Sequence, residues 1–533
     1  MISSFSIGNF KAFAKTQTIP IKPLTLIYGP NSSGKSSIIH SLLWAQHAHE
    51  TGELDVHHTK LGGASLDLGG FNQYVFAHIT SGTIDLSFNL TSRKKKFSYL
   101  DQILKFNPRI ELQIDCHSID SRSDPSVELR RFEIILGKES LIKMRLNKSG
   151  TLSVDTIDDS SILISEFIKK FTNQAFPTKM IDLRTYMIDY LTNHESMPRK
   201  GLLPNASPNI QVSDILDVFK GIAIKNSSSK DTTSKVKESL LKVISAYPSI
   251  FMGSILRPIQ NELDSFFANM SYLGPLRVYP TRHTELSKYI DPNWYSSGGM
   301  AWESIRKDKQ LRERVNAWLS DSSITKTPYE IKLSAMTDKL RLIEGIKNGL
   351  MVNDLEKNDL SHNPSQKLAN IIDSVSSSDL QELYLMDKRS PIMLSPCDVG
   401  MGISQVIPVI AYAYGLVNST IAIEQPEIHV HPSLQADLGD VFIESAIGKN
   451  NNRFIIETHS EHLILRILRR IREASEGSLS QNRSSIKPDD VAVLWVSPDK
   501  TGSSVHEIPI TPDGDFAENW PEGFFPERAR ELF

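Results

Sequence analysis

The sequence lacks most features of secreted, membrane-bound or globally basic proteins. Its 533 residues include only two cysteines, Cys116 and Cys397, which excludes a disulfide framework and favours a reducing compartment. No hydrophobic run approaches the length that spans a bilayer, and the N-terminus has no basic stretch followed by a long apolar one. The formal net charge of −3 gives no global electrostatic case for nucleic-acid binding. We therefore expect a cytoplasmic protein without membrane contact.

A sustained heptad repeat is also missing, which argues against a long coiled-coil arm. What is present is the composition of a globular protein, with 40% apolar and 23% charged residues. The chain is long enough for more than one domain and a large core.

The most informative segment is the glycine- and serine-rich run Gly29–Ser36, which fits the pattern G-x-x-x-x-G-K-[ST]. A β-type run over 24–28 precedes it, and a helix-compatible run over 36–44 follows. In such a loop, backbone N–H groups wrap phosphate oxygens, and the helix N-terminus adds positive potential. Lys35 can then reach the β- and γ-phosphates, and the Ser36 hydroxyl can ligate Mg²⁺. The predicted nucleoside triphosphate site includes Asn31, Gly34, Lys35, Ser36 and Ser37.

Two later runs predict buried parallel strands that end at this site. The run 419–423 leads directly into Glu424, a candidate ligand for Mg²⁺, with Gln425 beside the γ-phosphate. The run 453–457 is followed by His459, which suits contact with the γ-phosphate or with the attacking water. Since nearly four hundred residues separate Lys35 from Glu424, an insertion must split the nucleotide-binding domain.

A second glycine-containing loop, residues 398–405, precedes a helix-like run over 406–417. Gly402 and Ser404 in this loop are candidate phosphate contacts at a helix start. One domain with one nucleotide does not need two such loops. Two protomers arranged head to tail do, because each loop can close over the nucleotide of the other protomer.

With these motifs the chain resembles ABC-type ATPases of the RecF/SMC group. The resemblance rests on Ile7–Lys11, the P-loop, the 400–405 loop, Glu424–Glu427 and Thr458–Ser460. More narrowly, the chain is similar to prokaryotic ATPases with a Trp-Pro-x-Gly-Phe-Phe tail, here Trp520–Phe525, and with further matching segments at 272–277 and 315–319. Such PtuA-like ATPases occur in anti-phage defence loci of the Septu and retron types.

The resemblance implies an α/β fold, an ABC-type P-loop ATPase head with a mixed β-sheet flanked by helices and a largely helical insertion. The expected parts are an N-terminal lobe (1–97), an insertion of strands and then helices (98–270), a C-terminal lobe (271–500) and a tail (501–533). Within the insertion, helical patterns cover 234–246 and 255–270. Gln73 lies where the related fold has its Q-loop, which makes it a candidate metal or water contact, although a glycine-rich surface turn explains the same residues.

The implied chemistry uses ATP and Mg²⁺, the latter held by Ser36 and Glu424. Catalysis then depends on positioning water and stabilising charge, with Glu424, Gln425 and His459 as the catalytic residues. Related sites have a glutamate after the first acid, whereas this chain has Gln425, whose amide orients water but cannot accept a proton. Either Glu427 or another group substitutes, or hydrolysis is slow.

The implied role is a nucleotide-driven sensor or scaffold that dimerises and controls a separate nuclease of the HNH type. A retron reverse transcriptase with its DNA–RNA product, and direct contact with DNA, are further candidate partners. Two alternatives stay open: a RecF-like DNA repair clamp, and a self-contained ATPase-nuclease of the OLD type.

Several residues suggest a metal site or a DNA contact, but a structural role explains them as well or better. The His429/His431 pair fits a loop at a dimer interface better than a metal site. The arginines of 466–472 fit a solvated helix face better than a DNA contact. Arg277 fits a phosphate or interface contact and a surface ion pair equally well.

Overall fold

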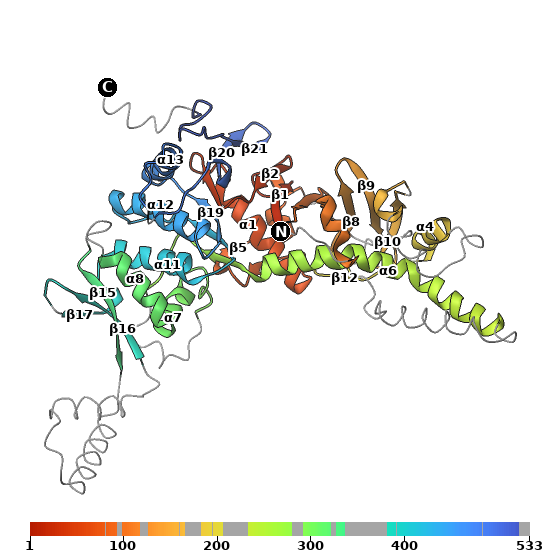
Figure 1. Cartoon of the computed structure of the whole chain (residues 1–533), viewed down its shortest axis with the longest axis horizontal. Helices are drawn as coiled ribbons and strands as arrows, with labels where there is room; N and C mark the ends of the chain where they lie inside the picture. The colour runs from red at the N-terminus through yellow and green to blue at the C-terminus, as the bar shows by residue number, and fades with distance from the viewer. Residues whose placement is uncertain are drawn as a thin grey trace, which may run out of the picture.

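The computed structural model describes residues 1–79, 81–92, 99–117, 126–158, 160–165, 183–194, 196–205, 233–279, 291–320, 327–335, 381–390, 392–481 and 483–521. Two large β-sheets organise these residues, and helices cover them (Figure 1). The architecture is the mixed α/β fold expected from the sequence.

The six-stranded sheet carries the P-loop. Its order is β14 (Met270–Leu273), β18 (Thr420–Glu424), β19 (Arg453–Glu457), β3 (Leu24–Tyr28), β20 (Val491–Asp499) and β21 (Gly502–Glu507). The first five strands are parallel to their neighbours, and β21 pairs antiparallel with β20. Every residue of β3 and β18 is buried, which is the pattern of a strand covered on both faces. The predicted buried parallel strands before Glu424 and before His459 are therefore confirmed.

The eight-stranded sheet is antiparallel throughout. Its order is β11 (Ser196–Met197), β10 (Leu152–Ile157), β9 (Glu139–Leu146), β8 (Ser126–Leu136), β7 (Arg109–His117), β6 (Ile84–Leu90), β1 (Ile2–Gly8) and β2 (Gln17–Pro20). Strand β6 of the expected N-terminal lobe pairs with β7 of the expected insertion. The expected boundary at residue 97 therefore falls within one continuous hydrogen-bonded sheet, and the strands of the insertion extend the sheet of the N-terminal lobe.

A third sheet and several short elements complete the strands. The third sheet holds β15 (Tyr329–Ala335), β16 (Gln381–Asp387) and β17 (Ile392–Leu394). The short strands are β4 (His58–Thr59), β5 (Gly63–Asp67), β12 (Arg199–Lys200) and β13 (Leu203–Pro204). The 3₁₀ turns are η1 (Phe76–His78), η2 (Tyr99–Phe106), η4 (Pro396–Asp398) and η5 (Pro488–Asp490).

The helices flank both large sheets. They are α1 (Lys35–Thr51), α2 (Phe71–Tyr74), α4 (Leu183–His194), α6 (Thr233–Ala268), α7 (Gly299–Lys307), α8 (Lys309–Ser320), α11 (Met401–Gly415), α12 (Pro432–Ile447) and α13 (Glu461–Ser475). The two helical patterns predicted over 234–246 and 255–270 belong to the single 36-residue helix α6. In Figure 1 this helix runs beneath the eight-stranded sheet and extends past it.

The six-stranded sheet separates two hydrophobic cores. Along β3, Leu24, Leu26 and Tyr28 face the core that contains α11, α12 and α13, whereas Ile27 faces the core that contains α1 and the eight-stranded sheet. This alternation is the period-two pattern of a strand with both faces covered. Because the P-loop follows β3, its position is set by packing on both sides of the sheet.

The C-terminal part returns to the P-loop strand. Trp520 is buried, and its ring packs edge-on against Tyr28 with centroids 5.3 Å apart and against Trp495 at 5.5 Å. The rest of the tail motif, from Glu522 to Phe525, lies outside the described residues.

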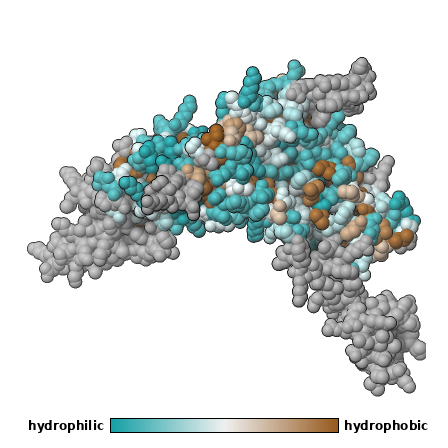
Figure 2. All heavy atoms as spheres, turned by 180° about the vertical axis from the view of Figure 1, so that it is seen from behind, coloured by the Kyte–Doolittle hydropathy of each residue, from teal (hydrophilic) through white to brown (hydrophobic). Residues whose placement is uncertain are grey.

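Seen from the opposite side, much of the surface is hydrophilic, and hydrophobic residues gather on the side of the molecule that carries α7, α8 and α11 (Figure 2). None of the helices in the described ranges is both long and apolar enough to span a membrane.

Candidate nucleotide site

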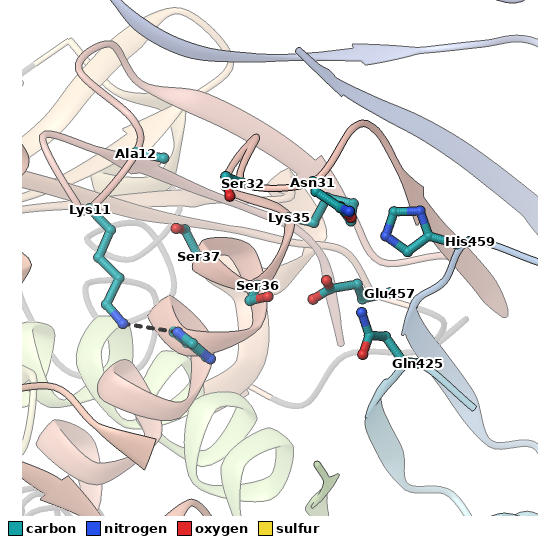
Figure 3. A pocket seen from close by; sticks show the side chains of 12 residues that line it. Lys11, Ala12, Asn31, Ser32, Lys35, Ser36, Ser37, Gln425, Glu457 and His459 are labelled. Carbon is teal, nitrogen blue, oxygen red and sulfur yellow. Dashed lines mark hydrogen bonds between the residues drawn. The ribbon is translucent and has the colours of Figure 1, made fainter. Parts of the chain in front are cut away.

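A pocket of about 440 Å³ opens at the carboxyl ends of β3, β18 and β19. Ligands of open α/β sheets bind at this edge, because loops and helix N-termini converge there. The lining residues come from the P-loop and α1, from the segment after β1, and from the ends of β18 and β19 (Figure 3). They are Lys11, Ala12, Asn31, Ser32, Gly34, Lys35, Ser36, Ser37, His40, Gln425, Glu457 and His459.

Two glycines give the P-loop a path that other residues cannot follow. Gly34, which begins α1, has φ +93°, and a Cβ there would come within 2.4 Å of the Ala12 Cβ. Gly29 has φ +147°, and its Cβ would come within 2.2 Å of the Val496 carbonyl oxygen. Positive φ and these close approaches together require glycine at both positions. The loop is therefore held against the segment after β1 on one side and β20 on the other.

Lys35 lies folded into the loop, with its side chain only 4% exposed. Its ammonium donates hydrogen bonds to the Gly29 and Pro30 carbonyl oxygens, at 3.1 and 2.8 Å. Burial lowers the pKa of Lys35, and the carboxylates of Glu457 and Glu427 partly offset this effect. The P-loop carbonyls thus hold the cation where a phosphate oxygen can replace them as its partner.

Two glutamates end the neighbouring strands β18 and β19 at the same level, because Glu424 and Glu457 are paired residues of the parallel ladder. Burial, and next the charge of Glu424, raise the pKa of Glu457 to about 7, although a hydrogen bond from Ser36 acts in the opposite direction. One Glu457 carboxylate oxygen is buried without a hydrogen-bond partner among the described residues. The Ser36 hydroxyl and the two carboxylates, one of which carries the orphaned buried oxygen, form a donor set that suits a hard divalent cation.

The Glu424 carboxylate is fixed from two sides. The Tyr272 hydroxyl donates to its Oε1 at 3.0 Å, and His40 Nε2 lies 3.3 Å from the same oxygen. On the other side of the ring, His40 Nδ1 accepts a hydrogen bond from Lys11 Nζ at 2.9 Å, drawn as a dashed line in Figure 3. Lys11 and His40 therefore connect the pocket wall to Glu424.

Gln425 and His459 face the pocket from neighbouring strand ends, with Glu457 beside them (Figure 3). Gln425 has an unusual φ of +47°, and its backbone N–H donates to the Glu457 carbonyl oxygen at 2.7 Å. His459 is exposed at the pocket rim, and partial burial followed by the charge of Lys35 lowers its pKa. A neutral imidazole and an amide, each able to donate and accept a hydrogen bond, thus face the same space.

Residues 1–464 match the AAA ATPase domain family. The match covers most of the chain and spans the P-loop, Glu424 and His459. The chain belongs to the AAA ATPase domain family. Residues 486–533 of this AAA ATPase also match a family of unknown function, DUF3696, which takes in β20, β21 and Trp520. No curated protein gives a significant match.

Solved structures similar to this AAA ATPase include three SMC head domains. One is an SMC head bound to the C-terminal winged-helix domain of ScpA, with 12% identity, a TM-score of 0.35, and 95% of this chain and 97% of that chain covered. The head domain from Thermotoga maritima has 8% identity, a TM-score of 0.33, and coverages of 96% and 99%. The head domain with an extended coiled coil from Pyrococcus furiosus, bound to the C-terminal domain of ScpA, has 12% identity, a TM-score of 0.32, and coverages of 100% and 98%. Likeness at this level adds nothing to the family assignment.

Most of the predicted site residues of the AAA ATPase meet in the pocket, and some do not. Glu424 does not line the pocket itself; it lies behind His40, and Tyr272 and His40 both contact its carboxylate. Gln73 is exposed on α2, outside the lining. Gly402 and Ser404 also lie outside it. We expected them in a loop before a helix over 406–417, but both belong to the first turn of α11, which begins at Met401. A Cβ on Gly402 would come within 2.4 Å of the His429 carbonyl oxygen, and the Ser404 hydroxyl donates to the Met401 carbonyl oxygen. Their contacts with nucleotide remain predictions.

We considered Glu427 as a substitute proton acceptor, but its carboxylate makes structural hydrogen bonds instead. Its Oε2 accepts a hydrogen bond from the Thr458 hydroxyl and its Oε1 accepts one from the His459 backbone N–H, both at 2.7 Å. Both oxygens therefore hold the 458–459 turn, and the residue is not part of the pocket lining. Glu427 positions His459.

Sequence reasoning missed four ionisable side chains at or beside the pocket, those of Lys11, His40, Tyr272 and Glu457. A signal existed for two of them. His40 lies one helical turn after Ser36, on the same face of α1, and Glu457 ends a predicted buried strand as Glu424 does. For Lys11 and Tyr272 the contacts span distant segments, and no local pattern indicates them.

Arg277 is not in a surface ion pair, since only 4% of it is exposed. The arginines of α13 fit the expected solvated face only in part: the side chain of Arg469 is 63% exposed, whereas those of Arg466 and Arg470 are only 18% and 10% exposed. Arg466 and Arg470 both bond Asp440, Arg469 bonds Glu473, and Arg472 bonds Asp515. These charges are neutralised within the protein.

His429 and His431 form no metal cluster: within the described ranges, no group of three or more His, Cys, Asp or Glu residues could hold a metal ion. His431 instead begins α12, where its ring accepts a hydrogen bond from the Ser433 backbone N–H.

Proposed function

We propose that this AAA ATPase binds Mg²⁺–ATP in the P-loop pocket, hydrolyses it slowly, and uses the bound state to pair two heads and to control a separate effector. The observation that carries the proposal is the pocket itself, in which Lys35, Ser36, Gln425, Glu457 and His459 converge at the end of the parallel strands. The chemistry of a P-loop ATPase requires such an arrangement of a cation, a hydroxyl, carboxylates and polar side chains.

The residues present fit both ATP and its metal. Lys35 and the P-loop N–H groups would neutralise phosphate charge, and Lys11 offers a second ammonium at the pocket wall. Ser36, Glu424 and Glu457 would hold Mg²⁺, and the orphaned oxygen of Glu457 supports this donor set. When bound, Mg²⁺ supplies positive charge to the phosphate oxygens during transfer.

Slow hydrolysis follows from the residue that faces the attacking water. Gln425 can orient water through its amide, but the amide cannot take the proton of that water. Glu427 does not replace it, because both of its oxygens hold the 458–459 turn. His459, neutral near pH 7 because its pKa is lowered, donates to or accepts from the same water or the γ-phosphate. The expected product is a long-lived ATP-bound state, which suits a switch.

Pairing of heads would explain the glycine-containing 400–405 segment, which forms the start of α11. Gly402 and Ser404 stay outside the pocket of their own protomer, so any contact with nucleotide through them belongs to a second copy. We therefore propose a head-to-tail homodimer in which each 400–405 segment, at the start of α11, closes over the ATP of its partner.

The effector proposal rests on the resemblance to PtuA-like ATPases, which the Trp520–Phe525 motif carries. We propose an anti-phage role in which the dimer restrains an HNH-type nuclease, in some loci together with a retron reverse transcriptase and its DNA–RNA product. A direct DNA contact through α13 finds no support in its neutralised arginines.

ATP binding tests the first part of the proposal. Lys35→Ala removes the buried cation and should weaken binding of a fluorescent ATP analogue about 100-fold, equivalent to about 3 kcal/mol for a charged hydrogen-bonded contact. Lys309→Ala, which changes a lysine with a 79% exposed side chain, is the matched control and should bind normally. Equal affinity of the two variants would refute the assignment of the pocket.

The pairing and the effector are tested together with the neighbouring genes expressed. Sedimentation should show a dimer with ATP and Mg²⁺ and a monomer with ADP. Purification in ATP and Mg²⁺, followed by mass spectrometry and nucleic-acid staining, should yield a stoichiometric nuclease. A bare dimer that retains duplex DNA would instead indicate a repair clamp, and metal-dependent DNA cleavage by the purified chain alone would indicate a self-contained nuclease.

A further inference from the structure

The loop after β14 has an inverted pattern of burial. Leu276 and Val278 are 76% and 53% exposed, whereas Arg277 between them is 4% exposed. Arginine is rarely buried so completely unless it has a specific partner. The loop is anchored at both ends, because the Gly274 and Val278 N–H groups donate to the Ser296 and Ser297 carbonyl oxygens, at 2.8 and 3.0 Å. Arg277 is therefore directed inward by a fixed backbone.

The Arg277 side chain grips the turn that carries Gln425. Its NH2 group donates to the Glu424 carbonyl oxygen at 2.6 Å and to the Gln425 carbonyl oxygen at 3.2 Å. Since the Gln425 N–H is bonded to the Glu457 carbonyl oxygen, the backbone of Gln425 is held on both sides. This hold keeps Gln425 in its left-handed conformation, with φ +47°, and so aims its side chain at the pocket.

The Arg277 backbone is bonded to Gln405, in the first turns of α11, which the 400–405 segment forms. The Gln405 side chain accepts from the Arg277 N–H at 3.3 Å and donates to the Arg277 carbonyl oxygen at 2.5 Å. Gln405 is buried in the first turns of α11, less than one turn after Gly402. Arg277 thus connects two regions: its side chain bonds the turn that carries Gln425, and its backbone bonds the start of α11.

A second contact joins the same two regions. Gly402 packs so closely against the His429 carbonyl oxygen that a Cβ would come within 2.4 Å of it. The start of α11 therefore touches the segment that follows Gln425, and a shift of α11 has to move or strain that segment.

The guanidinium itself is held without an ion-pair hydrogen bond. Its Nε and NH1 groups are buried and have no hydrogen-bond partner among the described residues. Burial lowers the pKa of Arg277 to about 10, and Glu427 and Glu424 nearby favour the charged form. A buried cation with unused donors is costly, so the packing around it must fix its position. A small shift of the surrounding backbone that offered Nε or NH1 an acceptor would be favourable, because each of these donors would then gain a hydrogen bond.

We propose that Arg277 is a positioning residue that couples the 400–405 segment at the start of α11 to Gln425, so that docking of a second protomer on that segment sets the hydrolysis step. This inference rests on the proposed head-to-tail dimer. It assigns Arg277 and Gln405 to the link between pairing and hydrolysis, separate from nucleotide binding.

The test compares nucleotide affinity, dimer formation and single-turnover hydrolysis in the full-length protein. Arg277→Met and Gln405→Ala should each lower the rate in the ATP-bound dimer by 10-fold or more, while the Kd for ATP and the dimer fraction change less than 3-fold. Arg277→Lys should restore part of the rate, since an ammonium can reach one carbonyl. Arg145→Met, which changes an arginine with a 62% exposed side chain in the eight-stranded sheet, is the control for loss of charge.

The double variant tests whether Arg277 and Gln405 affect hydrolysis through the same interaction. Arg277→Met with Gln405→Ala should be no slower than the slower single variant, because both break the same link. Multiplied effects, a parallel loss of affinity, or unchanged rates would overturn the inference. If Arg277→Met fails to fold, Arg277→Lys and Gln405→Ala carry the same comparison. Failure of the wild-type protein to bind ATP or to dimerise would overturn the proposed function instead.

Discussion

Restoring a carboxylate at position 425 is the most direct test of how the pocket handles the attacking water. Gln425→Glu places a proton acceptor where the wild-type chain has an amide, on a backbone that two hydrogen bonds already fix. A positioned general base contributes about 10²- to 10⁴-fold to a rate. Hydrolysis should therefore rise by about two orders of magnitude or more, with nucleotide affinity nearly unchanged.

The neighbouring carboxylates reduce this gain. Burial and Glu424 already raise the pKa of Glu457 to about 7, and the pKa of a new carboxyl beside them should be raised in the same direction. A raised pKa lowers the fraction of the enzyme that holds the active, ionised form at neutral pH. The rate of the variant should then climb as pH rises through this pKa, which a wild-type amide at this position cannot cause.

The assay is single-turnover phosphate release from pH 6 to 9, with excess enzyme over radiolabelled ATP. Gln425→Ala serves as the comparison that removes the amide without adding a base, and it should be slower than wild type. A wild-type rate that is already fast and is unchanged in Gln425→Glu would refute the reasoning, because another group would then accept the proton.

Three further predictions concern stability and the P-loop. Asp440→Asn leaves three arginines facing a neutral amide and should lower the free energy of unfolding by about 3 kcal/mol at pH 7, as judged by urea titration. Burial raises the pKa of Asp440, but the arginines more than offset this and hold it below the usual value, so the difference between variant and wild type should shrink as pH falls through that lowered pKa. Trp520→Ala should cost about 3 kcal/mol, and Trp520→Phe should cost clearly less, since an aromatic ring still covers Tyr28. Gly34→Ala should abolish binding of the ATP analogue while the circular dichroism spectrum stays helical, because its Cβ would collide with Ala12; normal binding would contradict the loop geometry.

The residues that the sequence revealed were those whose chemistry is local. Lys35 and Ser36 belong to one contiguous motif, and Glu424 and His459 each end a run of buried apolar residues. In these cases the neighbouring residues fix both the element and the direction of the side chain. The split of the nucleotide-binding domain followed from spacing alone, because a single βα unit cannot span the distance from Lys35 to Glu424.

The residues that stayed hidden depend on long-range packing. His40 and Tyr272 contact Glu424, and Lys11 contacts His40, from three separate segments of the chain. The spacing from Ser36 places His40 on the same face of α1, but it does not indicate the contact with Glu424. The burial of Arg277 between two exposed apolar residues even opposes the usual local pattern. The continuity of the eight-stranded sheet across residue 97 was missed for a similar reason, since strand pairing is a property of partners and not of one strand.

The order of strands around β3 has a consequence for how the chain is made. Both sheet neighbours of β3, β19 and β20, lie more than 400 residues downstream of it. At about 5–20 residues per second, a ribosome needs roughly 20–80 seconds to supply the first of them. During that interval the nascent chain carries β3, a mostly apolar strand that is fully buried in the finished fold, with two open edges and no complete site for nucleotide. Nascent chains of this protein should therefore bind chaperones that recognise extended apolar segments, and release should coincide with emergence of β19 and β20.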